Sequence, residues 1–525
     1  MNPSYTDDKS ICADLLVVPV FDGCELGEEA RKLDAHFGGL LSARMKNKEE
    51  FKAKFAQPLR LTVDPAFGTQ EVLLLGMGKP ENLNEEQVRK LGGAIMTAVK
   101  NVGARSIDFA VDSVEAMSIS KEKLAAELAD SLVERSYRFD KYKTTKASND
   151  NPDLKASFIV DDPQIAQVLH ARLHNITSSK ALAKDYGNEP ANILTPVAYA
   201  KRIETEFFNQ PNVKTKTLDM EDMAALGMGG VLAVSQGSTR NPARIVVIEY
   251  DGTNGEQDRP FGLVGKGVTF DTGGYNLKPG GSMADMKTDM CGSAAVVGAM
   301  CALVLNKEPV KVVAIVGLAE NMIDGHSYRP SDIITMMKGV TVEVGNTDAE
   351  GRLILADCMT YLQREYDPVA LADIATLTGA MVVALGNTHT GIFSNDDGFR
   401  ALVEEAGKRS GELAWPMPLC EQHTSAVKGK LADLSNTGSM NGAGASTAAA
   451  FLQEFVEPNK DGSVRPWVHL DIAGTSRQDG QVSGVGVRML RELVATYEAK
   501  DNTALKPVLS NDNGPDAAPT AAQEA

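Results

Sequence analysis

The sequence predicts an α/β protein with two domains, and three observations support this prediction. The chain has 525 residues, more than a single hydrophobic core usually organises. Short apolar runs typical of buried strands alternate with longer stretches of helical spacing. A polar, irregular stretch at 141–152, rich in Lys, Ser, Asn and Asp, interrupts the alternation. Because alternating strands and helices are typical of α/β folds, we expect two units of this class.

The first unit is expected at residues 1–162. Its apolar runs predict buried strands, with one amphipathic helix among them. The strands expected are Leu15–Val18, Glu71–Gly76, Ser106–Val111 and Ser157–Val160, and the helix is Glu86–Val102. Residues 163–185 have helical spacing and are expected to form a linker helix between the two units.

The second unit is expected at residues 186–501. Its pattern predicts a largely parallel or mixed sheet covered by helices. The strands expected are Arg244–Glu249, Phe261–Asp271, Val310–Gly317, Thr341–Val344 and Leu371–Ala375, with helices at Asp289–Leu305 and Leu353–Glu365. After Lys500 the chain is rich in Ala, Pro, Asn, Asp and Thr without periodicity, so 502–525 is expected to be a disordered tail.

The overall composition excludes several classes of protein. Hydrophobic residues make up 43% and charged residues 23% of the chain, as in globular soluble proteins. A net charge of −17 and a pI near 5.0 disfavour a general nucleic-acid or anionic-membrane surface. The six cysteines show no CxxC pairing, which favours reduced thiols in the cytoplasm. No signal peptide is expected at the N-terminus, and no uncharged run is expected to approach the length that spans a bilayer.

The segment 346–353, Asn-Thr-Asp-Ala-Glu-Gly-Arg-Leu, places two carboxylates and a guanidinium within five residues. If the segment is extended, Asp348 and Glu350 share one face, and Arg352 follows on the same side. Two carboxylates held together need a cation between them, because their like charges otherwise raise one pKa and neutralise that group. A hard divalent metal ion is the natural candidate.

A second group of charged residues lies upstream. The strand expected at Phe261–Asp271 carries Lys266 among apolar residues and ends at Asp271, and Lys278 and Asp289 follow. Taken singly, an aspartate here is usually a turn or a cap and a lysine is usually solvated. Unpaired charges beside apolar strands are costly, however. Four carboxylates with two lysines and an arginine therefore suggest two metal ions that share bridging carboxylates.

The types of donor narrow the chemistry. These segments contain no histidine, so they do not form a His-x-x-x-His zinc site; His469 is expected to be a satisfied core residue. Carboxylate oxygens with one amine suit zinc, manganese, magnesium or cobalt. The chain shows neither a Gly-x-x-x-x-Gly-Lys-Ser/Thr phosphate loop nor a Gly-x-Ser-x-Gly elbow, so nucleotide hydrolysis of that type and serine-hydrolase chemistry have no support.

The two charged segments resemble the signature sequences of the leucyl aminopeptidase family, the M17 metallopeptidases. The resemblance rests on Lys-Gly-Val-Thr-Phe-Asp-Thr-Gly-Gly at 266–274 and on the segment 346–353. It continues through 188–192, 320–321, 328–330, 373–380 and 467–474 in the family's order and spacing, and so covers 185–488. It implies a macro-like N-terminal domain, a larger catalytic domain, cleavage of N-terminal residues from peptides and assembly as a homohexamer.

The resemblance also implies roles for individual residues. Asp271 and Glu350 would bridge two metal ions, Asp348 would complete one site, and Lys266 with Asp289 would complete the other. Lys278 would stabilise the oxyanion, and Arg352 would hold a bicarbonate ion that shuttles a proton. The walls of the pocket for the N-terminal side chain and the backbone contacts to the peptide would come from Met286, Thr376, Leu377, Gly379 and Ala473.

Several alternatives remain open from the sequence alone. Arg352 could instead form a structural ion pair with nearby carboxylates. Met286 could simply fill space in the hydrophobic core. The sequence departs from the family pattern at four positions that bear on substrate specificity: Asn276, Cys291, Ser293 and Ser476. For Cys291, a buried and unreactive thiol is the simpler explanation. A narrower dipeptidase is a second hypothesis. The third is a DNA-binding or structural homologue that keeps the peptidase fold.

Overall fold

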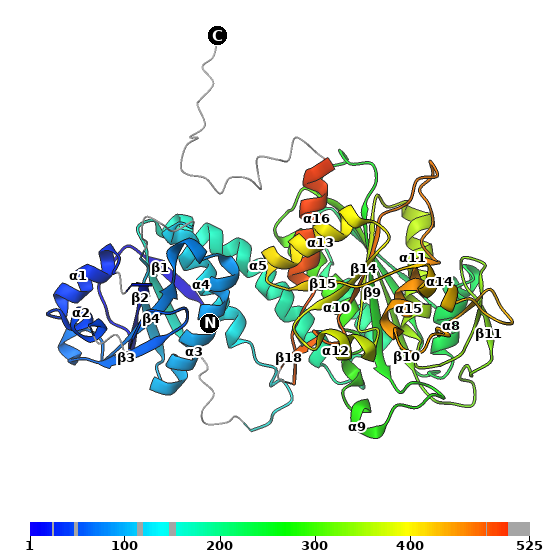
Figure 1. Cartoon of the computed structure of the whole chain (residues 1–525), viewed down its shortest axis with the longest axis horizontal. Coiled ribbons are helices and arrows are strands. Elements are labelled where there is room, and N and C mark those ends of the chain that lie inside the picture. The colour runs from blue at the N-terminus through cyan, green and yellow to red at the C-terminus, as the bar shows by residue number, and fades with distance from the viewer. Residues whose placement is uncertain (24–25, 47–50, 113–118, 146–153, 479, 502–525) are drawn as a thin grey trace, which may run out of the picture.

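The computed structural model describes the chain except for residues 24–25, 47–50, 113–118, 146–153, 479 and 502–525. The tail expected at 502–525 lies outside the described residues. Two separate sheets, one of six strands and one of eight, form the centres of two α/β units, as the sequence predicts (Figure 1).

The N-terminal sheet has the strand order β1-β6-β5-β2-β4-β3, and only β3 and β4 pair antiparallel. Alternate residues of the buried strand β2 face two different cores, Leu15 and Val17 on one side and Leu16 and Val18 on the other. Helices cover both faces, as a mainly parallel sheet requires. The elements are β1 (Pro3–Thr6), β2 (Leu15–Phe21), α1 (Glu28–His36), α2 (Leu40–Met45), β3 (Pro58–Thr62), β4 (Glu71–Gly78), α3 (Glu85–Val102), β5 (Ser106–Ala110), α4 (Lys121–Ser136) and β6 (Lys155–Ile159).

A single long helix, α5 (Pro163–Asn188), connects the two units and packs against helices of both (Figure 1). Its start is specified locally: the Asp162 side chain accepts hydrogen bonds from the N–H groups of Gln164 and Ile165. Its end precedes Pro190, which disfavours helical geometry at the residue before it. The helix runs three residues past the predicted end at 185.

The C-terminal sheet has the order β15-β14-β17-β13-β9-β10-β8-β7. Strands β17, β13, β9 and β10 are parallel neighbours, whereas β7, β8 and β14 add antiparallel pairings, so the sheet is mixed. Its strands are β7 (Val213–Leu218), β8 (Arg244–Asp251), β9 (Phe261–Asp271), β10 (Lys311–Asn321), β13 (Leu371–Ala375), β14 (Thr390–Ser394), β15 (Ala414–Pro416) and β17 (Trp467–Asp471).

Helices cover both faces of this sheet. The face towards the N-terminal unit is covered by α10 (Cys291–Leu305), α13 (Asp397–Ser410) and α16 (Val487–Asp501) (Figure 1), and α6 (Pro196–Glu206) packs into the same core. The other face is covered by α7 (Met220–Ala225), α8 (Gly229–Ser235), α11 (Gly351–Tyr366) and α15 (Gly444–Gln453). The remaining elements are α9 (Gly280–Met283), η3 (Met286–Thr288), α12 (Gly379–Leu385), α14 (Glu421–Ala426), β11 (Ile333–Thr335), β12 (Thr341–Glu343), β16 (Leu434–Ser435), β18 (Arg477–Gln478) and β19 (Gln481–Val482).

The helical stretch Met286–Leu305 corrects one expectation, because it is long and apolar enough to span a membrane. Within its most apolar window, 94% of the residues are buried inside the protein, as in the core helix of a globular domain. Gly292 allows this helix to touch the sheet, since a Cβ atom there would lie 2.2 Å from the carbonyl oxygen of Ile374.

The parallel strands place their carboxyl ends along one edge of the sheet. β9 ends at Asp271 beside Asn321 at the end of β10, and β13 ends at Ala375 beside Asp471 at the end of β17. Ligand sites in open α/β sheets lie at such edges. Three buried polar side chains, those of Asp271, Asn321 and Asp471, therefore lie along the edge where chemistry is expected.

Candidate active site

Three of the predicted ligands converge at this edge. Asp271 comes from the end of β9, and Asp348 and Glu350 come from the loop that leads into α11. One carboxylate oxygen from each lies within 4.8 Å of the others. Gly273 makes the close approach possible, because its φ is +86° and a Cβ atom there would lie 2.7 Å from Oδ1 of Asp348.

The reason given for this convergence in the sequence analysis was wrong. The backbone is not extended here: Asp348 lies in a turn, and Glu350 has helical backbone angles at the N-cap of α11. The two carboxylates meet because the turn folds the chain back towards Asp271. Arg352 lies in the first turn of the helix, where its side chain is buried.

Lys266 joins the cluster from the interior of β9. Its ammonium lies 2.9 Å from Oδ1 of Asp289 and 2.8 Å from Oε1 of Glu350, and it donates a hydrogen bond to the carbonyl oxygen of Thr376 at 3.0 Å. Only 3% of the Lys266 side chain is exposed. The structure thus brings Lys266, Asp289 and Glu350 together on the side of the cluster away from Asp348.

Lys278 approaches from the opposite side. Its ammonium lies 2.8 Å from Oδ2 of Asp271 and 2.5 Å from Oδ1 of Asp348. Its side chain is 16% exposed, so it stands at the border between the cluster and solvent. This is the geometry of a cation that can reach a substrate oxygen beside the carboxylates.

Burial and mutual repulsion perturb the acids of the cluster. Burial raises the pKa values of Asp289 and Glu350, and the charge of Asp271 raises both further. Burial also raises the pKa of Asp348. For Lys266, burial acts to lower the pKa, but the charges of Asp289, Glu350 and Asp271 outweigh it and raise the pKa. The cluster is therefore an arrangement of like charges that requires cations.

The donor set fits divalent metal ions. Oδ2 of Asp289 and Oε2 of Glu350 are buried without a hydrogen-bond partner among the described residues. Buried carboxylate oxygens normally have partners, so these two are suited to be ligands of a cation. Carboxylate oxygens with one amine suit zinc, manganese, cobalt or magnesium.

Arg352 lies next to the cluster without joining it. Its NH1 group donates a hydrogen bond to the carbonyl oxygen of Asn436 at 2.8 Å, and its Nε is buried without a partner among the described residues. Burial lowers its pKa to about 10, against the charges of Glu350 and Asp471. Within the described residues no carboxylate lies within 4.0 Å of its guanidinium, so the structural ion pair considered above is not formed.

The residues expected to contact substrate border the cluster on the loop that follows β13. Thr376 donates from its hydroxyl to Oδ1 of Asp289 at 2.7 Å. Leu377 is half-buried, and Gly379 is exposed at the start of α12, with open space where a Cβ would lie. Met286 and Ala473 are half-buried on neighbouring segments.

Two buried residues without a role predicted from the sequence, Asn321 and Asp471, hold these parts together. Asn321 donates from Nδ2 to Oδ1 of Asp271 at 2.8 Å and to the carbonyl oxygen of Thr347 at 2.9 Å. Asp471 accepts from the N–H groups of Leu377 at 3.2 Å and Ala473 at 3.0 Å. In the sequence, each of these two residues is a polar residue at the end of an apolar strand. This pattern indicates a role in the site only when the order of the strands in the sheet is known.

Asp471 also accepts a hydrogen bond from the hydroxyl of Thr378 at 2.7 Å. Thr378 in turn caps α12, since its side chain accepts from the N–H of Met381. One buried carboxylate therefore fixes both backbone segments that are expected to contact substrate.

The departures from the family pattern have structural roles. Asn276 accepts the N–H of Thr347 at 2.9 Å, so it ties the two signature segments together. Burial, with the charge of Asp289, raises the pKa of Cys291 to about 12, which is the behaviour of an inert thiol. Ser293 is buried and donates to the carbonyl oxygen of Met290 at 2.7 Å. Ser476 is also buried.

His469 is a buried core residue, as expected, but it is not fully satisfied, because its Nε2 has no hydrogen-bond partner among the described residues. Its Nδ1 lies 2.6 Å from Oδ1 of Asp373, whose other oxygen accepts the indole N–H of Trp467 at 2.8 Å. Burial acts to lower the pKa of His469, but the charge of Asp373 and its hydrogen bond outweigh this and raise it.

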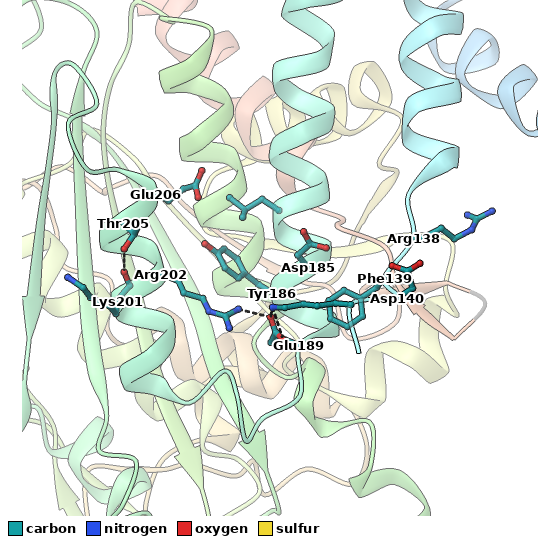
Figure 2. Close-up of a pocket in the computed structure, with 12 residues that line it drawn as sticks. Arg138, Phe139, Asp140, Asp185, Tyr186, Glu189, Lys201, Arg202, Thr205 and Glu206 are labelled. Atoms are coloured by element: carbon teal, nitrogen blue, oxygen red, sulfur yellow. Dashed lines mark hydrogen bonds and ion pairs between the residues drawn. The ribbon is translucent and has the colours of Figure 1, made fainter. Parts of the chain in front are cut away.

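The motif at 188–192 lies outside the cluster, beside a cavity of about 530 Å³ (Figure 2). Glu189 is buried there and pairs with Lys141 at 2.9 Å and Arg202 at 2.6 Å. The ammonium of Lys287 donates to the carbonyl oxygen of Asn188 at 2.8 Å. The motif therefore anchors the end of α5 to the segment that carries Met286, and does not take part in the cluster.

Comparison with known proteins identifies the family to which both parts of the chain are similar. The sequence model of the cytosol aminopeptidase family, catalytic domain, matches residues 181–491, and that of the family's N-terminal domain matches 17–146. A probable cytosol aminopeptidase of Rickettsia bellii is 38% identical over 94% of this chain and 99% of the relative. One from Methylorubrum populi is 41% identical over 92% and 95%.

Solved structures agree with the sequence matches. A mutant of tomato leucine aminopeptidase superposes with a TM-score of 0.82 and 31% identity, covering 94% of this chain and 96% of that one. The bottromycin maturation enzyme BotP in complex with Mn superposes with a TM-score of 0.78 and 30% identity, covering 93% and 100%. The chain therefore belongs to the cytosol aminopeptidase family, the M17 peptidases, and is an aminopeptidase.

Proposed function

We propose that this aminopeptidase hydrolyses the N-terminal peptide bond of peptides with two divalent metal ions held by Lys266, Asp271, Asp289, Asp348 and Glu350. The observation that supports this most strongly is the buried cluster itself. It gathers four carboxylates with two lysines, and two carboxylate oxygens have no partner among the described residues. Asp271 and Glu350, whose carboxylate oxygens lie within 4.8 Å of one another and of Asp348, would be the ligands shared by the two ions.

Two further residues, Lys278 and Arg352, would act in catalysis beside the metal ions. When bound, the two ions would supply Lewis acidity and make a bound water acidic near neutral pH. Lys278 would stabilise the negative charge that develops on the carbonyl oxygen of the scissile bond. Arg352, with its unpartnered Nε, would hold a bicarbonate ion, because no side chain of the cluster is an evident general base for the leaving amine.

Substrate would lie along the loop after β13. The backbone of Leu377 and Gly379 would bind the peptide, and the N-terminal side chain would contact Met286, Thr376 and Ala473. The free α-amino group of the peptide would be held at the carboxylate cluster. Cleavage would then be confined to the first residue.

The metals, assembly and location are proposed from the relatives. Manganese is named for the BotP structure, so zinc or manganese is the first choice, with cobalt or magnesium as the next. A homohexamer in the cytoplasm follows from the family resemblance and from relatives named cytosol aminopeptidases. We also propose that 1–162 and 186–501 are separate domains joined by the helix at 163–185, with 502–525 as a tail.

Replacing Glu350 by alanine tests the site. Glu350→Ala should abolish hydrolysis with every metal added, because the bridging carboxylate is lost, while the melting temperature stays close to that of the wild type. Glu365→Ala is the matched control, since Glu365 is an exposed carboxylate on the same helix, and it should retain full activity. Activity that persists in Glu350→Ala would contradict the assignment.

A DNA-binding or structural role remains the alternative. It would require that the buried cluster has no catalytic use, although its five ligand positions all carry metal-binding side chains. The absence of turnover with any metal, in protein that is folded, would favour this alternative over the enzyme.

A further inference from the structure

A second cleft, of about 680 Å³, lies between the two domains. One wall comes from the N-terminal domain, through α3 and α4, and α5 forms the floor. The other wall comes from the turn after α12, the end of α13 and the hairpin β18–β19. None of the proposed metal ligands lines this cleft.

The lining has a strong excess of positive charge. Two carboxylates, Glu134 and Glu412, line the cleft. Seven cationic side chains also line it: Arg89, Lys90, Arg135, Arg138, Lys180, Lys184 and Arg488. The chain as a whole has a net charge of −17, so the positive charge of this cleft is a local property that the overall composition does not explain.

The buried cations in the cleft are not all neutralised within the protein. Three of them share Glu134: Lys180 at 3.0 Å, Arg488 at 3.2 Å and Lys184 at 4.0 Å. Lys180 has a second carboxylate in Glu412 at 3.1 Å, and Arg488 has one in Asp130 at 2.8 Å. Lys184 is left with the longest of these contacts, although its side chain is only 13% exposed.

The electrostatics of Lys184 reflect this shortage of negative charge. Burial is the main cause that lowers its pKa to about 8, and the nearby charges of Lys180, Arg135 and Arg488 lower it further against the attraction of Glu134. The ammonium also lies 5.1 Å from the centre of the Tyr137 ring. A lysine in such surroundings gains stability when an anion approaches it.

Two exposed arginines stand at the cleft. Arg135 lies in the last turn of α4 and Arg138 lies just beyond its end, and both are exposed. Arg138 also borders the cavity beside Glu189, but its guanidinium extends away from the Glu189 cluster (Figure 2). Its NH1 group donates to the carbonyl oxygens of Tyr137 at 2.8 Å and Arg135 at 3.4 Å. The other nitrogens of this guanidinium, with the exposed side chain of Arg135, are the groups offered to a ligand in the cleft.

We propose that this interdomain cleft binds a small phosphate-bearing anion, with Lys184 at its centre and Arg135 and Arg138 at its mouth. Phosphate groups suit several converging cations because they carry multiple charges and accept forked hydrogen bonds from arginine. The volume lies within the range of small-ligand sites. A long polyanion such as DNA fits less well, because the acidic remainder of the surface would repel it.

Calorimetric titration of the metal-loaded protein tests the proposal, with pyrophosphate and with a nucleoside diphosphate as probes. Both should bind saturably if the phosphate groups are the recognised part, whereas binding of the nucleotide alone would show that its base and sugar also contribute. Lys184→Met keeps the apolar stem and should weaken binding at least about tenfold, as expected when a charged partner is lost.

The double variant Arg135→Gln with Arg138→Gln alters only exposed side chains and should weaken binding similarly. Lys214→Met is the control, because Lys214 is an exposed lysine on β7 outside the cleft, and it should bind like the wild type. Binding that stays unchanged in both cleft variants would place the anion elsewhere, for example at the metal ions, and would overturn the proposal. The absence of saturable binding of either probe to the wild type would overturn it as well.

Discussion

Replacing Asn321 by alanine probes how the proposed metal centre is held together. Asn321 is fully buried, and its amide donates to Oδ1 of Asp271 at 2.8 Å and to the carbonyl oxygen of Thr347 at 2.9 Å. It thus joins the ligand at the end of β9 to the turn that carries Asp348. In Asn321→Ala, Oδ1 of Asp271 loses the side-chain donor of Asn321 and keeps only the hydrogen bond from the backbone N–H of Gly273.

The expected magnitude follows from the hydrogen bond that is lost. A hydrogen bond to a charged acceptor contributes about 1.5–3 kcal/mol, and each 1.4 kcal/mol is roughly a factor of ten in affinity. Partners of metal ligands typically contribute about 10–100-fold to metal affinity, which agrees with this range. We therefore expect the apparent Kd for manganese or zinc to rise about 10–100-fold in Asn321→Ala.

The assay is a metal titration of activity in protein stripped of ions. At saturating metal, kcat should largely recover, because the ligands themselves are intact. Asn241→Ala is the matched control: the amide of Asn241 also donates two hydrogen bonds, both to the carboxylate of Glu320, which precedes Asn321 in the chain and is not a proposed ligand. Unchanged metal dependence in folded Asn321→Ala would refute the reasoning.

Three further predictions concern other parts of the protein. Lys278→Met should lower kcat by about 10²–10³ with peptide substrates, the usual effect of removing an oxyanion donor, and wild-type kcat in this variant would exclude that role. Asp471→Ala should raise KM for peptides without changing metal affinity. In Asp471→Asn the amide oxygen can still accept from the N–H groups of Leu377 and Ala473, and Nδ2 can donate to the Thr378 hydroxyl in a reversed bond, so this variant should behave like the wild type; equal KM values in the two variants would contradict this. Burial raises the pKa of Asp357 from 3.8 to about 7 against three backbone hydrogen bonds, so its contribution to stability is fully present below about pH 4 and is lost as the pH rises through about 7. The difference in Tm between the wild type and Asp357→Asn should therefore narrow from pH 5 to pH 8, and a constant difference would contradict the raised pKa.

The fold class and several elements could be predicted because their signals are local. β9 is present at Phe261–Asp271 and β13 at Leu371–Ala375, as predicted, since both are apolar runs bounded by polar residues. β10 was predicted to end at Gly317 but continues to Asn321. Its last two residues, Glu320 and Asn321, are polar, and only partners from other segments make their burial tolerable.

The residues of the candidate site could be named from the sequence, but their geometry could not. The motifs indicated which side chains carry charge, yet the turn at Asp348 and the helical backbone of Glu350 depend on how the loop packs against Gly273. The roles of Asn321 and Asp471 depend on strand order, because β9 lies beside β10 and β13 beside β17. Neighbouring strands in a parallel sheet are set by tertiary packing, which periodicity does not encode.

The measurement that tests the central claim most directly is hydrolysis of aminoacyl-p-nitroanilides and dipeptides by protein stripped of metal. Zinc, manganese, cobalt or magnesium would be added back one at a time. The proposed two-metal site predicts activity that depends on added metal and that releases only the N-terminal residue. Turnover of dipeptides but not of aminoacyl-p-nitroanilides would identify the protein as a dipeptidase. Full activity without any metal, or no turnover with any of the four ions, would contradict it.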